Sequence, residues 1–178
     1  MSNNYNGIFA DIGSTQVTRQ GVYLGAGNHI LQCVRCKLQQ SQKDHNKLWF
    51  IAEFKVIESD NPKHKPGHEV TWLQDMDKPT RQGAVGNVKG FALGFDPDSG
   101  ANVGEDEMLA IIGENSPVKG LAIRAQGIEL TTKANRLFTK FNWHYVEQGK
   151  TLADCGFATQ NAPVSLEQPQ NGVAPPNF

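Results

Sequence analysis

The stretch KLWFIAEFKVIES, residues 47–59, alternates between two kinds of side chain and decides the fold class. Every second residue from Leu48 to Val56 is apolar, which is typical of a strand that lays one face on a hydrophobic core. The opposite face places the large ring of Trp49 on the same side as the cation of Lys55. We therefore predict a β-strand with a buried apolar face and a mixed face that is available for binding.

Neighbouring segments supply the other strands of a mainly β domain. A polar turn separates the strand at residues 47–59 from an alternating segment before it, residues 28–40, NHILQCVRCKLQQ. The two segments predict a β-hairpin. Residues 68–76, HEVTWLQDM, predict a third strand. Residues 120–146 predict a closing hairpin that turns at KANR. Its second strand repeats the opening pattern. One face holds the apolar residues Leu137, Phe141, Trp143 and Tyr145, and the other mixes a ring with cations in Arg136, Phe138, Lys140, Asn142 and His144.

A helix is predicted between the third and fourth strands. In residues 78–95, KPTRQGAVGNVKGFALGF, Pro79 suits a first helical turn, and Val85, Val88 and Phe91 recur at helical spacing. Five strands with a helix in this position are the element order of an OB-fold barrel, and a small β-sandwich is the alternative. We predict one domain over residues 1–150. Residues 151–178, rich in Pro, Gln and Asn, predict a flexible, disordered tail.

Composition and charge narrow the function classes. The net charge is −1, but the charges are segregated: residues 29–89 carry +3, residues 119–150 carry +4 and residues 90–118 carry −6. The predicted strands are therefore basic, which permits a basic groove on a nearly neutral protein. The three cysteines argue against a disulfide framework and fit a reducing cytoplasm. We expect neither a secretory signal nor a transmembrane segment.

The mixed faces are the candidate binding site. Proteins that bind single-stranded nucleic acid align cations with the phosphates and stack aromatic side chains on the bases. The candidates for stacking are Trp49, Trp72 and Phe138; those for phosphate contact are Arg35, Lys37, Lys55, Arg124, Arg136 and Lys140; His144 could donate or stack. The competing interpretation is that each ring packs beneath a loop while the cations are simply solvated.

A zinc site is the second candidate, because Cys33, Cys36, His64 and His68 have the spacing Cys-x2-Cys and His-x3-His. On a regular strand an offset of three sends Cys33 and Cys36 to opposite faces, so we predict buried thiols and no metal or cofactor. No phosphate loop, GxSxG elbow or HExxH motif occurs in the chain, and we predict that it is not an enzyme. A metal-dependent enzyme built on these four residues is the remaining catalytic alternative.

Several segments together resemble bacteriophage single-stranded-DNA-binding proteins with an OB-fold. They are GVYLGAGNHILQCVRCK, LWFIAEFKVIES, GHEVTWL, AVGNVKGFALGF and KANRLFTKFNWHYV, and the resemblance covers residues 21–147. It implies a non-catalytic protein that coats single-stranded DNA during phage replication, recombination or repair in the cytoplasm of the infected bacterium. It also implies a flexible acidic tail that ends in an aromatic residue and recruits replication or recombination proteins. Separately, we leave open a homo-oligomer. This chain ends in Phe178, but Asp154 and Glu167 are the only acids after residue 150.

A structural virion or assembly protein with a β-barrel or sandwich is the alternative function. Its mixed faces would be subunit interfaces, in which aromatic residues and Arg are also enriched.

Overall fold

The computed structural model describes residues 22–41, 47–77, 81–96, 98 and 103–157. These residues form six strands and two helices: β1 (Val22–Tyr23), β2 (Gly27–Gln40), β3 (Leu48–Ser59), β4 (Glu69–Asp75), α1 (Arg81–Leu93), α2 (Glu105–Ile112), β5 (Ala122–Thr131) and β6 (Leu137–Tyr145). The prediction of a mainly β protein is confirmed. The strand count differs by the two-residue β1, and α2 is a second helix where the sequence predicted only one.

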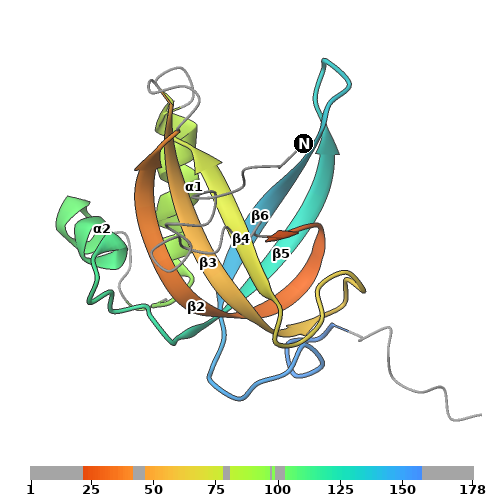
Figure 1. Ribbon diagram of the computed structural model, residues 1–178. Coiled ribbons are helices and arrows are strands. Elements are labelled where there is room, and N and C mark those ends of the chain that lie inside the picture. The colour runs from red at the N-terminus through yellow and green to blue at the C-terminus, as the bar shows by residue number, and fades with distance from the viewer. Residues whose placement is uncertain (1–21, 42–46, 78–80, 97, 99–102, 158–178) are drawn as a thin grey trace, which may run out of the picture.

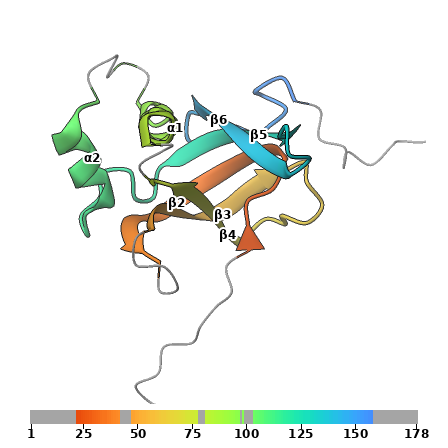
Figure 2. The ribbon, with the colours of Figure 1, turned by 90° about the horizontal axis from the view of Figure 1, so that it is seen from above.

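All six strands belong to one sheet in the order β1-β4-β3-β2-β5-β6, and it curls into a half-barrel (Figures 1 and 2). Every pairing is antiparallel except that of β1 with β4. The long β2 holds the sheet together, because residues 29–40 pair with β3 while residues 27–32 pair with β5. Sequence neighbours β2 and β3 form the predicted hairpin, and so do β5 and β6.

The core fills the concave side of the half-barrel. Phe50, Ala52, Phe54 and Val56 of β3 are all buried, so the predicted core face of this strand is confirmed. Phe91 of α1 contacts rings from both ends of the sheet, with edge or tilted geometries at centroid distances of 5.1 to 6.0 Å. These rings are Phe50, Phe54, Trp72 and Trp143. α1 therefore packs on the concave side, which supports the predicted helix and explains its apolar spacing.

The prediction that Cys33 and Cys36 face opposite sides of a regular strand is wrong. Both are buried at 1% exposure, and their sulfur atoms lie 3.8 Å apart. The register between β2 and β3 shifts between Cys33 and Arg35, so Val34 bulges out and is 42% exposed. The extra residue of a β-bulge changes the side-chain alternation, which returns Cys36 to the core face. The hydrogen bond to Cys33 and burial raise the pKa of the Cys36 thiol, and both thiols are buried as predicted.

The folded part of the chain continues beyond Lys150, where the domain was predicted to end. Leu152 is fully buried and packs with Ile30 and Val146, with Cys155 and Phe157 beside them. The backbone N–H of Leu152 also donates to the carboxylate of Glu58 over 2.7 Å. We call residues 146–157 the C-terminal segment. The predicted tail from residue 158 onward lies outside the described residues.

Candidate nucleic-acid interface

The sheet has an outer face, opposite the core, and the strand registers show which predicted residues lie on it. β3 contributes Trp49 and Lys55, which pair with Asp75 and Glu69 of β4. Trp49 is half-buried and Lys55 is exposed. Both therefore lie on the predicted mixed face of β3.

Trp72 is not available for stacking, and its prediction as a base-binding residue is wrong. It is 7% exposed, and its ring lies 5.8 Å from that of Phe50 and 4.8 Å from that of Trp143. Trp72 pairs with Ala52, whose side chain is in the core, so the register assigns the tryptophan to the concave side. The ring helps to bridge β4 and β6 across the half-barrel.

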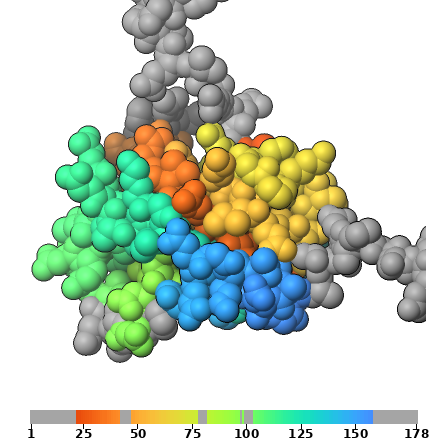
Figure 3. All heavy atoms as spheres, turned by 90° about the horizontal axis from the view of Figure 1, so that it is seen from below, coloured from red at the N-terminus to blue at the C-terminus, as the bar shows by residue number. Residues whose placement is uncertain are grey.

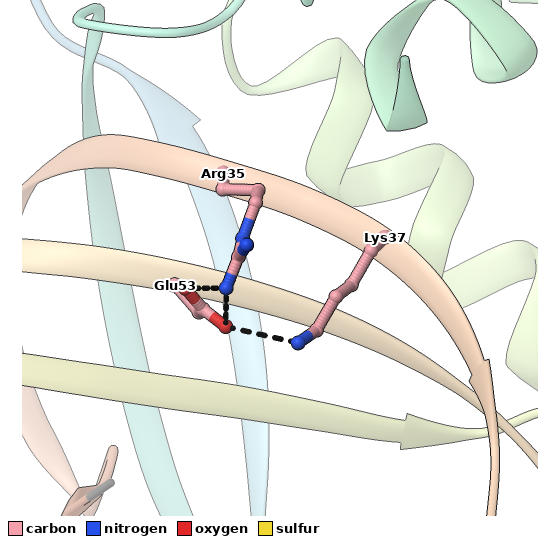
Figure 4. A network of polar contacts seen from close by, with 3 residues as sticks. All are labelled: Arg35, Lys37 and Glu53. Atoms are coloured by element: carbon pink, nitrogen blue, oxygen red, sulfur yellow. Dashed lines mark hydrogen bonds and ion pairs between the residues drawn. The ribbon is translucent and has the colours of Figure 1, made fainter. Parts of the chain in front are cut away.

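Arg35 and Lys37 lie on the outer face of β2, where both bind one carboxylate (Figure 4). Arg35 Nη2 donates to both oxygens of Glu53 at 2.9 Å, and Lys37 Nζ lies 3.4 Å from Glu53 Oε1. Burial raises the pKa of the Glu53 carboxyl, but the hydrogen bonds and charge of Arg35 and the charge of Lys37 outweigh it and lower the pKa overall. The carboxylate thus offsets part of the positive charge that the sequence offered for phosphate binding.

The hairpin of β5 and β6 continues past the point at which β5 stops pairing with β2 and rises on one side of the half-barrel (Figure 1). β5 pairs with β2 only as far as Gly127, and we call residues 128–140 the arm. On its outer face Ile128 pairs with Lys140, and Leu130 pairs with Phe138. The side chain of Phe138 is 46% exposed, and those of Ile128 and Leu130 are exposed as well. The arm therefore carries a ring and a cation on one face, as predicted for Phe138 and Lys140.

The arm also contains features that the sequence prediction missed. Ile128 and Leu130 were not recognised as surface residues, because an apolar alternation in a strand ordinarily indicates a core face. Arg136 is exposed beside the turn, which Asn135 closes with a φ of 57°. In Figure 1 this turn and the start of β3 rise at the same end of the molecule, on its two sides.

Arg124 and His144 pair with each other at the base of the hairpin, on the same outer face. The guanidinium of Arg124 lies 4.8 Å from the ring centroid of Phe157, so the C-terminal segment covers part of this cation. Burial, followed by the charge of Arg124, lowers the pKa of His144. Both predicted residues are half-buried rather than freely exposed.

The C-terminal segment separates the predicted site into two regions. It covers Ile30 in β2, between the β3–β4 surface and the base of the hairpin. Figure 3 shows its atoms, in blue, beside the orange and yellow atoms of β2 and the region around β3. The outer face is therefore divided into two regions. One is β3, with Trp49 and Lys55 six residues apart, and the other is the arm, with Phe138 and Lys140 two residues apart. The single trough that the sequence suggested is interrupted at the middle of the sheet.

The four residues of the zinc hypothesis have different surroundings. Cys33 and Cys36 are in the core, His68 is exposed, and His64 accepts a hydrogen bond from the Gly25 N–H over 2.9 Å at its Nε2. Within the described parts of the chain, no three His, Cys, Asp or Glu side chains are grouped so that they could hold a metal ion.

His64 belongs instead to a buried polar cluster with His29. The two rings meet edge-on at a centroid distance of 5.4 Å, and neither is more than 3% exposed. His29 Nε2 lies 3.0 Å from the Gly25 carbonyl oxygen and must donate to it, so Nδ1 accepts from the Ser59 hydroxyl at 2.8 Å. Burial is the main reason that the pKa of His29 is lowered to about 4. Burial also lowers the pKa of His64.

An apolar groove of about 570 Å³ lies between the two helices and the end of β2. Leu38, Val85, Val88, Met108, Leu109 and Ile112 are among its lining residues. The sequence pattern contained no sign of this groove, because α2 was not predicted.

The chain matches no protein-family model, and no curated protein sequence is similar to it. None of the described helices has the length and apolar character required to cross a membrane.

Proposed function

We propose that the protein binds single-stranded DNA with little sequence preference and that its half-barrel is of the OB type. The strand order β4-β3-β2-β5-β6 supports this fold, since β2 is shared by two neighbours and α1 follows the third strand of the barrel. β1 is then an addition at the edge. OB-folds bind oligonucleotides on the face of their second and third strands and on the two loops that flank it. Here these parts correspond to β3, β4, the β2–β3 turn and the arm.

The main support for the proposal is the exposed ring beside exposed cations on the outer face of the arm. Phe138 is half-exposed, faces the same side as Lys140, and lies two residues from the exposed Arg136. A base can stack on this ring while the neighbouring cations contact its phosphates, and each such stack contributes about 1–3 kcal/mol. On β3, Trp49 and Lys55 also share the outer face, but they stand six residues apart near opposite ends of the strand.

The charge distribution predicts a moderate dependence on salt. Lys55, Lys133, Arg136 and Lys140 are exposed, whereas Arg35 and Lys37 share Glu53. Because each neutralised phosphate of a single strand releases about 0.7 of a counterion, a few contacts give a shallow slope of affinity against salt. The biological role that fits is protection of single strands in phage replication, recombination or repair.

The test is a pair of titrations with labelled oligo-dT and with a duplex of equal length, followed by anisotropy and by tryptophan fluorescence. We expect binding to the single strand that is tighter than to the duplex and weakens as salt rises. Fluorescence quenching should come mainly from Trp49, because Trp72 is in the core and Trp143 packs against it. The variant Trp49→Phe should therefore lose most of the quenching. Absence of binding at low salt, or equal affinity for duplex, would contradict the proposal.

A structural or assembly role is the second candidate, and the exposed apolar residues of the arm favour it too, since such residues are common at interfaces. It predicts salt-insensitive assembly into large particles without DNA. Sedimentation of the protein alone at low and high salt distinguishes it from the first proposal.

A further inference from the structure

β6 is the last strand of the sheet, and within the described residues no strand pairs with its far side. Its pairing with β5 runs in an unbroken register from Leu137 to Tyr145, without a bulge, and it contains no proline. Leu137 is 70% exposed at its start. A regular and apolar edge of this kind offers unpaired backbone groups to another strand, and proteins ordinarily block such edges.

The hydrogen bonds of the turn show which backbone groups of β6 point outward. The N–H of Thr132 donates to the carbonyl of Arg136 over 2.9 Å, so this pair faces inward between the two strands. In an antiparallel ladder the inward and outward positions alternate. The N–H and C=O groups of Leu137, Thr139 and Phe141 are therefore directed away from β5, towards the open edge.

We infer that β6 pairs edge to edge, in antiparallel orientation, with β6 of a second copy of this chain about a two-fold axis at Thr139. In this register Thr139 lies opposite Thr139 of the second copy, and Leu137 lies opposite Phe141. The outward groups of these residues form about six new backbone hydrogen bonds. On the outer face Phe138 lies opposite Lys140 of the second copy, a pairing of ring and cation that occurs twice.

Two copies would pair less favourably in the neighbouring registers of β6, and also through the free edge of β5. Moving the axis to Lys140 places two lysines opposite each other, and moving it to Phe138 places Arg136 opposite Lys140. The free edge of β5 begins only after Gly127, and self-pairing about its centre brings two Glu129 side chains together. The two-fold contact also closes on itself and gives a dimer, not a filament.

The area available on the arm belongs to the weak class of interfaces, below about 1,200 Å² in total, so the dimer should form reversibly. The inference does not depend on DNA binding, and its test contains no DNA. Sedimentation velocity over a wide range of protein concentrations should show a monomer–dimer equilibrium. The variant Leu137→Asp should weaken the dimer at least about tenfold, since it places a charge opposite Phe141 of the second copy.

The control is Leu109→Asp, because Leu109 is 54% exposed on α2, away from the edge, and this variant should dimerise like the wild type. The register is tested by Thr139→Cys in a Cys155→Ser background, which should cross-link into a disulfide dimer under mild oxidation. Thr131→Cys on β5 should remain monomeric under the same conditions. A wild type that is monomeric throughout, equal effects of the two aspartates, or cross-linking through residue 131 but not 139 would overturn the inference.

Discussion

Acidification should destabilise this protein through the buried ring of His29, because the folded state holds this ring in its neutral form. The pKa of His29 is lowered from 6.5 to about 4, mainly by burial, and the nearby His64 lowers it further against the opposing charge of Asp60. Since the folded-state pKa is the lower one, the unfolded chain takes up the proton first as pH falls. Stability from this group is thus complete above pH 6.5, declines between pH 6.5 and about 4, and falls no further below that.

The size of the loss follows from the same two values. Each pH unit between them contributes about 1.4 kcal/mol, so the free energy of unfolding should drop by about 3 kcal/mol across this window. For a domain with a total stability of about 5–15 kcal/mol this is a large fraction. The proton would have to enter at Nδ1, where Ser59 now donates, so protonation would reverse that hydrogen bond and make Ser59 Oγ the acceptor.

Urea denaturation at a series of pH values measures this loss, with His29→Gln as the reference. The variant should have a much flatter dependence of unfolding free energy on pH between 6.5 and about 4, whatever its absolute stability. An NMR titration of the His29 ring in the wild type gives a second readout that needs no variant. Titration of the folded ring near pH 6.5, or equal pH slopes for both proteins, would refute the reasoning.

Further predictions concern the outer face and the packing of glycines. Phe138→Ala should weaken binding to oligo-dT about 5- to 150-fold. The control is Tyr145→Ala, because Tyr145 is similarly exposed but lies on the opposite face of β6, and this variant should bind oligo-dT as the wild type does. Similar losses of affinity in the two variants would reject the face assignment. Glu53→Gln should strengthen binding to single strands at low salt, because it frees two cations, and an unchanged anisotropy curve would exclude these cations from the interface. Gly127→Ala should destabilise the protein by about 1–3 kcal/mol in urea, since its Cβ would lie 2.8 Å from the Gly25 carbonyl oxygen. Gly86→Ala, with open space around its Cβ in α1, should instead stabilise it by about 0.5–1 kcal/mol, and a destabilised variant would contradict the helix assignment.

Sequence alternation predicted the strand faces wherever the strands are regular. It assigned the buried face of β3 and the two faces of β6, because the register of β6 with β5 has no irregularity. It failed in β2, since the bulge at Val34 has no glycine or proline to mark it. Trp72 could have been assigned to the core, because it alternates with Glu69 and Thr71 and shares the face of Val70.

Long-range packing was the part that a local pattern could not contain. Leu152 does not belong to an apolar alternation in the sequence, and only its contact with Ile30 and Val146 explains why it is buried. Glu53 likewise appeared as one acid on a basic face, and its pairing with Arg35 depends on the register between β2 and β3. These two contacts determine how much of the outer surface remains open.

The anchoring of the C-terminal segment sets the point at which the chain can be divided in the laboratory. A shortened chain that stops at Lys150 would lack Leu152 and Phe157, leaving the side chain of Ile30 and the carboxylate of Glu58 without their covering partners. Such a product should aggregate or lose cooperative unfolding for reasons unrelated to any ligand. Affinity tags and fluorescent fusions therefore belong after Phe157, and comparisons of shortened forms should start from that residue.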